Sequence, residues 1–136
     1  MKYFTIKELS RSQKAKEKKI DNTPEGVHEE NLTRLIDYVL DPLRESYGSA
    51  IYVNSGYRNE LVNYLVGGSP NSHHQCEGGY AAADITTKTK KGNKRLFELA
   101  QELDLPFCQL INEKNYSWIH ISYNPKDIRK EVFSKD

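Results

Sequence analysis

Three of the four histidines lie where their side chains could hold a metal ion. His73 and His74 occupy a loop rich in Gly and Ser, and His120 lies in a predicted strand near the end of the chain. Asp84 follows three alanines in another predicted strand, whereas His28 fits a solvated position near the start of a helix. A catalytic zinc ion takes three ligands of the His, Asp or Glu type and keeps one position open. A loop His, a strand Asp and a strand His that converge at one edge of a sheet would supply that set.

Five motifs surround these residues in a fixed order along the chain. They are Ser55–Asn59, Val66–Ser69, Ser72–His74, Ala82–Ile85 and Trp118–Tyr123. Together they resemble the zinc D-Ala-D-Ala carboxypeptidase family, which includes phage endolysins, D,D-dipeptidases of vancomycin resistance and relatives with the Hedgehog fold. The segments Phe4–Leu9 and Asp21–Pro24 extend the resemblance to small stand-alone members from gut bacteria and their phages, so it covers nearly the whole chain.

The resemblance assigns roles to individual residues. The metal ligands of the family fall on His74, Asp84 and His120, which implies one Zn²⁺ ion per chain. The arginine of its Ser-Gly-Tyr-Arg motif falls on Arg58, which implies that this side chain holds or polarises the substrate. The residues that we further expect to contact substrate are Ser72, Gln109 and Trp118.

The loop before Asp84 departs from the family pattern. Relatives usually place the loop histidine seven residues before the aspartate, but His74 lies ten residues before Asp84. A three-residue insertion in a loop that contains glycine can bulge outward at a small cost in free energy. The longer loop leaves His73 open as the ligand in place of His74, and Cys76 as a less favoured thiolate substitute.

The general base is the second departure. Many relatives carry an acidic residue three positions before the final histidine, where this chain has Ser117. We expect Glu113 to take that role, because a hairpin turn at 114–117 pairs Glu113 with Trp118. Strand alternation then puts Glu113 diagonal to His120 on the same face of the sheet. A carboxylate there can accept a proton from water at the metal and pass it to the leaving amine.

The elements that position these residues predict an α+β fold. Helices are expected to pack on a small antiparallel sheet of the Hedgehog/DD-peptidase type, with Asp84 and His120 on its edge strands. An apolar stripe from Leu32 to Leu43 predicts a core helix with a kink at Asp41-Pro42. This core helix is predicted to begin at Thr23-Pro24, and other predicted helices run from Thr5 towards Lys19, over 60–66 and over 94–103. Predicted strands cover 51–53, 81–86, 107–113 and 117–123, and a charged tail at 125–136 is expected on the surface.

Length and composition set the remaining expectations. The 136 residues fit one zinc peptidase domain over 1–136, which we expect to be a monomer. A net charge of +1 argues against a nucleic-acid partner, although residues 1–20 form a basic segment with seven Lys/Arg. No apolar run approaches the roughly 20 residues that span a bilayer, and no apolar stretch follows Lys2 as in a secretory signal. We therefore expect synthesis in the cytoplasm and action on the cell wall after release, as in phage lysis.

The expected function is zinc-dependent hydrolysis of peptide bonds in the stem peptides of peptidoglycan. The enzyme would be a D,D-carboxypeptidase or an endolysin-type L,D-endopeptidase, because Arg58 can grip a terminal carboxylate or stabilise an oxyanion. The alternative is a catalytically inactive wall-binding or virion structural protein that retains the fold, which Ser117 and the altered loop favour. A third hypothesis is a metal-binding module that docks a partner through the basic segment at 1–20.

Overall fold

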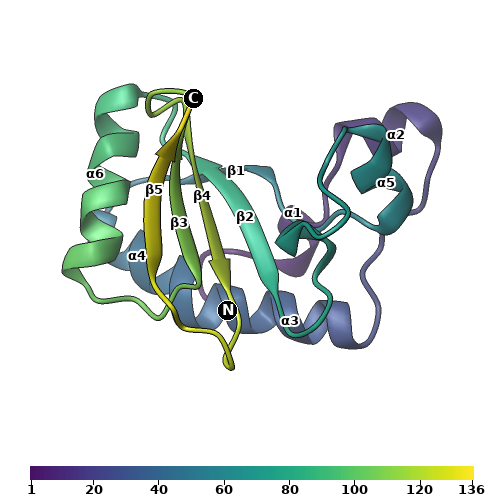
Figure 1. Cartoon of the computed structure of the whole chain (residues 1–136), viewed down its shortest axis with the longest axis horizontal. Helices are drawn as coiled ribbons and strands as arrows, with labels where there is room; N and C mark the ends of the chain where they lie inside the picture. The colour runs from purple at the N-terminus through teal and green to yellow at the C-terminus, as the bar shows by residue number, and fades with distance from the viewer.

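A five-stranded sheet lies against three helices, and a smaller lobe of short helices stands beside it (Figure 1). The computed structural model describes all residues, 1–136. The helices are α1 (Ile6–Leu9), α2 (Gln13–Lys18), α3 (Val27–Leu35), α4 (Asp41–Tyr47), α5 (Glu60–Leu65) and α6 (Lys90–Glu102), with a π-helical segment η1 (Ile36–Leu40) and a 3₁₀ turn η2 (His73–Gln75). The strands are β1 (Tyr52–Ser55), β2 (Ala81–Thr86), β3 (Gln109–Glu113), β4 (Trp118–Tyr123) and β5 (Glu131–Lys135). The predicted α+β class is confirmed.

The order of the strands corrects two expectations about the sheet. The order is β1-β2-β4-β3-β5, so β2 and β4, which carry Asp84 and His120, are interior neighbours rather than edge strands. The sheet is mixed rather than purely antiparallel, because β5 pairs with β3 in parallel. The tail is therefore not a loose end, although every residue of β5 is exposed. The charged composition of the tail gave no sign of β5, which backbone hydrogen bonds to β3 hold in place.

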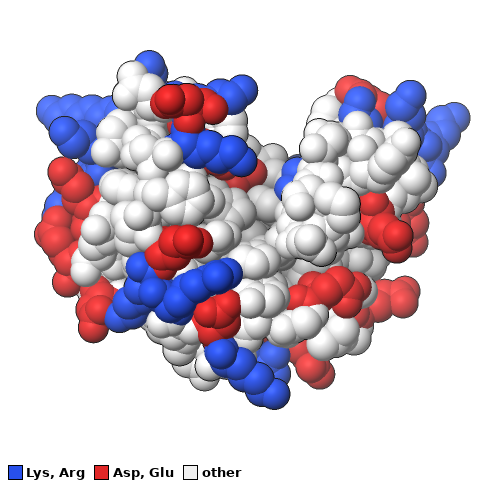
Figure 2. All heavy atoms as spheres, viewed as in Figure 1, with Lys and Arg blue, Asp and Glu red and all other residues white.

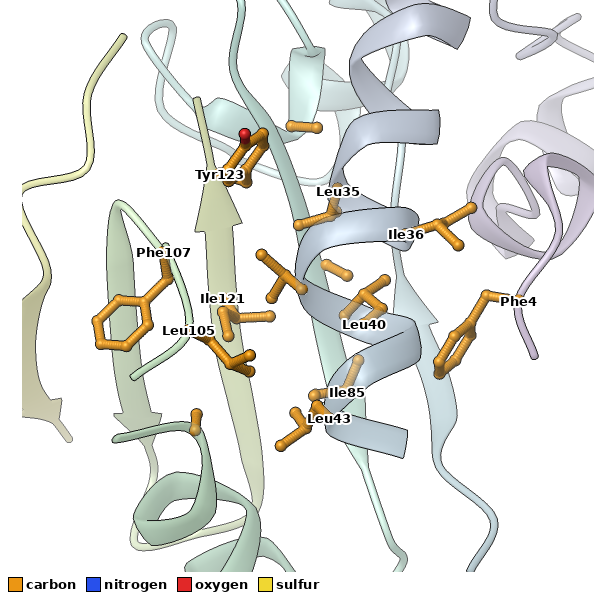
Figure 3. Close-up of a cluster of buried hydrophobic side chains, with 14 of the residues drawn as sticks. Phe4, Leu35, Ile36, Leu40, Leu43, Ile85, Leu105, Phe107, Ile121 and Tyr123 are labelled. Carbon is orange, nitrogen blue, oxygen red and sulfur yellow. The ribbon is translucent and has the colours of Figure 1, made fainter. Parts of the chain in front are cut away.

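The predicted core helix crosses the back of the sheet as one continuous path through α3, η1 and α4 (Figure 3). Its apolar stripe, which includes Leu35 and Leu40, packs against Ile85 and Ile121 in one buried cluster. The predicted irregularity at Pro42 takes the form of the π-helical turn η1, which immediately precedes α4. Proline lacks the N–H that a helix interior needs, and a π turn is one of the ways a helix absorbs that loss.

Alternation along β2 and β4 separates the core from the opposite face. Ala83, Ile85 and Ile121 belong to the hydrophobic cluster beneath the helices. Side chains one residue away in a strand point to the other face. Asp84 and His120 therefore lie on the face that α3, α4 and α6 do not cover.

The smaller lobe corrects the expected N-terminal helices. Thr5 caps α1 as predicted, with its side chain accepting a hydrogen bond from the Glu8 N–H, but α1 ends after one turn. Ser12 then caps a separate helix, α2. The next helix begins at Val27 rather than at Thr23-Pro24. This lobe carries α5 as well, and Figure 2 shows a hollow between it and the sheet.

Candidate metal centre

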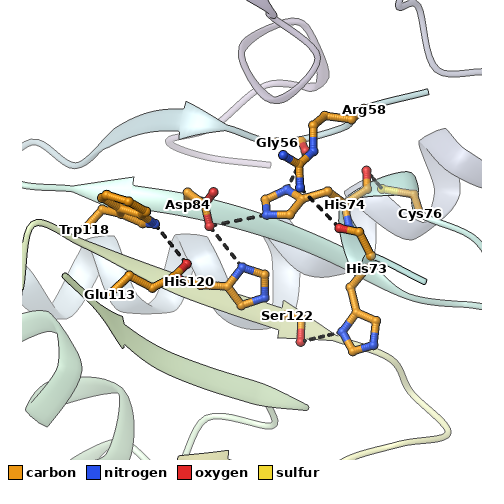
Figure 4. A network of polar contacts seen from close by, with 11 residues as sticks. Gly56, Arg58, His73, His74, Cys76, Asp84, Glu113, Trp118, His120 and Ser122 are labelled. Atoms are coloured by element: carbon orange, nitrogen blue, oxygen red, sulfur yellow. Dashed lines mark hydrogen bonds and ion pairs between the residues drawn. The ribbon is translucent and has the colours of Figure 1, made fainter. Parts of the chain in front are cut away.

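Asp84 and His120 come together because their strands pair in register. Asp84 on β2 lies directly opposite His120 on β4. The His120 Nδ1 atom is 3.0 Å from the Asp84 Oδ1 atom. Backbone ladders on both sides of these interior strands fix the two side chains relative to each other (Figure 4).

His74 reaches the same point from the loop between α5 and β2. Ser72 caps the 3₁₀ turn that presents it, with its Oγ atom accepting a hydrogen bond from the His74 N–H at 3.2 Å. The imidazole is buried, with the Nδ1 atom 2.8 Å from the Gly56 carbonyl oxygen and the Nε2 atom 3.3 Å from Asp84 Oδ1. The carbonyl can only accept, so it fixes the proton on Nδ1 and leaves Nε2 free to bind a metal.

Gly56 is a residue whose role the sequence analysis missed. The Tyr57 N–H donates a hydrogen bond to the Leu9 carbonyl at 2.6 Å, which holds this segment against α1. A Cβ atom at Gly56 would lie 2.1 Å from the Leu9 carbonyl oxygen, so only glycine fits here. The requirement for glycine at this position is therefore steric. Gly56 belongs to the Ser-Gly-Tyr-Arg motif, in which the family resemblance implied a role only for Arg58.

The three side chains fit a catalytic zinc site in donor type and in charge. Their ligand atoms, two imidazole nitrogens and one carboxylate oxygen, lie within 4.8 Å of one another. Burial disfavours the charged form of Asp84, but the two histidines outweigh it and hold the pKa of this carboxyl well below its usual range. Burial also lowers the pKa of His74, which keeps the ring neutral. Divalent metals bind an ionised carboxylate and an unprotonated imidazole nitrogen, so both directions favour metal binding.

His73 and Cys76, the two alternatives to His74 as metal ligand, make other contacts. The His73 Nδ1 atom is 3.2 Å from Ser122 Oγ, and its ring stacks on Tyr80 with the centroids 3.9 Å apart. Burial lowers the pKa of His73 to about 4. Cys76 is fully buried in the hydrophobic cluster, where burial raises the pKa of its thiol to about 12. The structure therefore brings His74, and neither His73 nor Cys76, to Asp84 and His120.

Glu113 lies in the register that the sequence predicted for it. It pairs with Trp118, while Ile111 pairs with His120, so Glu113 and His120 are diagonal neighbours on one face. The Trp118 Nε1–H group donates a hydrogen bond to Glu113 Oε2 at 3.1 Å. That bond orients the carboxylate and leaves its second oxygen as a free acceptor (Figure 4).

Arg58 points its side chain toward this group of residues. Its backbone N–H donates to the His74 carbonyl at 2.8 Å, and its Nη2 atom donates to Ser72 Oγ at 3.2 Å. The Nε atom is buried without a hydrogen-bond partner. Burial lowers the pKa of Arg58, while the nearby charges of Asp84 and Glu113 raise it. A partly buried guanidinium with unused donors is suited to binding an anionic group.

The comparison with protein families decides what kind of protein carries this site. A family model described as Peptidase M15 matches residues 2–122. The chain belongs to the peptidase M15 family. The resemblance to zinc D-Ala-D-Ala carboxypeptidases is thereby confirmed, and the match includes the three residues of the candidate metal centre. A comparison with curated proteins finds no match.

Two other residues expected to contact substrate in this M15 peptidase lie in different settings. Ser72 is part of the centre, since it caps the turn of His74 and accepts a hydrogen bond from Arg58. The Gln109 side chain donates a hydrogen bond to Glu131 Oε1 on β5 at 2.7 Å. Finally, no helix of this M15 peptidase is both long enough and apolar enough to cross a membrane.

Proposed function

We propose that this M15 peptidase hydrolyses peptide bonds in the stem peptides of bacterial peptidoglycan, using one zinc ion at His74, Asp84 and His120. The observation that carries the proposal is the convergence of three metal-ligating atoms within 4.8 Å on the uncovered face of the sheet. A zinc ion held there would polarise the scissile carbonyl and lower the pKa of water to about 7. Family membership supports a metallopeptidase, and the choice of wall peptide is our inference.

Glu113 is the proposed general base. Its Oε2 atom accepts the hydrogen bond from Trp118, so the other oxygen is free to take a proton from the attacking water. The same carboxyl can then pass that proton to the leaving amine. Ser117, which occupies the position of the acidic residue in many relatives, donates its hydroxyl to the Lys114 carbonyl at the hairpin turn. It has no acid–base role in this scheme.

Arg58 is the proposed electrostatic partner of the substrate. Its unpaired Nε–H is buried beside the centre, and leaving such a donor unsatisfied has a cost that a bound anionic oxygen would remove. In a carboxypeptidase reaction that oxygen belongs to the terminal carboxylate. In an endopeptidase reaction it is the oxyanion that develops as water attacks the peptide carbonyl.

The test is to incubate the purified chain with peptidoglycan, with and without a chelator. The proposal expects release of peptide or D-alanine that the chelator abolishes and added zinc restores. Mass spectrometry of the products also distinguishes a carboxypeptidase from an endopeptidase. Binding to the wall with no product in the presence of zinc would instead support the non-catalytic wall-binding protein that Ser117 favours.

A further inference from the structure

A cavity lies beside the candidate metal centre rather than over it. Its volume is about 950 Å³, and its walls come from α5, the start of α3 and the loop that carries His74. Asp84 and His120 do not line it, but Ser72 and His73 do. One loop thus forms a wall of this cavity and also holds the candidate ligand His74, so a single large substrate can occupy both places.

The charge of the cavity disfavours an anionic ligand. No lysine or arginine lines it, whereas two carboxylates, Glu60 and Glu77, do. Glu77 is partnered by His28, whose Nε2 atom is 2.8 Å from its Oε1 atom. Glu60 has no such partner and remains a free acceptor at the start of α5. Phosphate-rich wall polymers and the acidic parts of stem peptides would be repelled here.

Aromatic rings and amides make up most of the remaining wall. Three tyrosines, Tyr57, Tyr64 and Tyr80, line the cavity together with several asparagine and glutamine side chains. Tyr64 is 77 % exposed on α5, so packing within the chain does not explain its position. An aromatic face pairs with the C–H face of a sugar ring, and amides and carboxylates pair with its hydroxyl and acetamido groups. A neutral ligand with flat C–H faces and many hydrogen-bonding groups matches this lining.

We propose that this cavity is a glycan subsite that binds the neutral N-acetylated amino sugars of the wall strand, with Tyr64 as its stacking platform. The inference rests on the proposed function, which places a wall substrate in the adjoining centre. The subsite anchors the glycan, and the attached peptide extends past Ser72 toward Arg58. It adds affinity for intact wall over free stem peptide without taking part in the chemistry.

Binding of a soluble sugar tests the subsite independently of hydrolysis. The probe is a β-1,4-linked tetramer of N-acetylglucosamine, titrated into the full chain by NMR and calorimetry in the presence of a chelator. We expect saturable binding with shifts at α5 and the loop at 69–79, weakened at least tenfold by Tyr64→Ala, in line with the loss of about 1.4 kcal/mol or more of stacking energy. Tyr38→Ala is the matched control, since Tyr38 is 56 % exposed on η1 and lies outside the cavity. Absence of saturable binding, or equal loss in both variants, overturns the proposal.

Hydrolysis then separates this inference from the proposed function. Tyr64→Ala should lower the kcat/KM for glycan-linked peptide at least tenfold and leave that for a sugar-free stem peptide unchanged. Equal loss on both substrates would mean that the cavity binds peptide, which overturns the glycan assignment. If the tetramer binds but no wall peptide is cleaved, the proposed function fails and the subsite stands. If peptide is cleaved but the tetramer does not bind, only the subsite fails.

Discussion

Asp84 and His120 reach the candidate metal centre from neighbouring strands, whereas His74 reaches it from a loop. The strand pair is fixed by the register of β2 and β4, in which the two residues are directly opposite. The loop residue depends on individual contacts, namely the Gly56 carbonyl at Nδ1 and the Ser72 hydroxyl at its backbone N–H. Many backbone hydrogen bonds hold each strand in place, so the loss of one bond moves its side chains little. The loop is held by few contacts, so the loss of one can displace His74. Substitutions around the loop should therefore change zinc affinity through residues that never touch the metal.

The largest expected effect comes from removing a strand ligand. His120→Ala should lose stoichiometric zinc and lower hydrolysis of stem peptide by about a thousandfold, because a metal supplies several kcal/mol of transition-state stabilisation. Metal analysis and product release measure the two quantities. His28→Ala, which removes a histidine outside the cluster, should keep both on a sugar-free peptide. Normal zinc content and full activity in His120→Ala would show that the site is wrongly assigned.

The second effect concerns the base on the neighbouring strand β3. Glu113→Gln should keep one zinc per chain and lower kcat by about 10² to 10⁴, the usual contribution of a positioned general base. Glu131→Gln, which changes an exposed carboxylate on β5, is the matched control and should leave the rate unchanged. A nearly normal rate in Glu113→Gln would mean that another group accepts the proton.

The third effect comes from the support of the loop ligand. Gly56→Ala would place a Cβ atom 2.1 Å from the Leu9 carbonyl oxygen, so the carbonyl that holds His74 must shift. Loss of such an outer contact typically lowers metal affinity by about 10–100-fold, which competition with a chromophoric chelator would measure. Gly26→Ala is the control for general backbone strain, because Gly26 has a φ of +51° but nothing lies within 4 Å of its added Cβ atom, and it should leave zinc affinity unchanged. Equal affinities in the two variants would argue that the loop is not held through Gly56.

The smallest effect is expected at His73, next to the loop ligand. His73→Ala should keep one zinc per chain and change the affinity by less than about threefold, since the ring contacts Ser122 and Tyr80 rather than the cluster. His74→Ala should lose the metal. The opposite outcome in this pair, measured by metal analysis, would reassign the loop ligand to His73.

The same contrast explains what the sequence could predict. The pairing of Glu113 with Trp118 followed from a short hairpin turn and strand alternation, both of which are local. The pairing of Asp84 with His120 joins distant segments, and the expectation of edge strands was wrong because sequence patterns do not give strand order. The choice between His73 and His74 depends on Gly56 and Ser122, which lie far away along the chain.

The C-terminal strand shows a different limit. Glu131–Lys135 is fully exposed, so it lacks the apolar alternation from which strands are predicted. It forms because β3 offers an unpaired edge and because Gln109 donates its side-chain amide to Glu131. An edge that is open to pairing is a property of the folded sheet and cannot be seen in the residues of the tail.

The most direct test of the account is a crystal structure of the zinc-loaded chain with anomalous diffraction recorded at the zinc absorption edge. We predict a single anomalous peak about 2.0–2.2 Å from His74 Nε2, His120 Nδ1 and a carboxylate oxygen of Asp84, with one coordination position facing Arg58 and Glu113. A peak bound by His73 or Cys76, or no peak between β2 and β4, would contradict the central claim that two strands and one loop hold the catalytic metal.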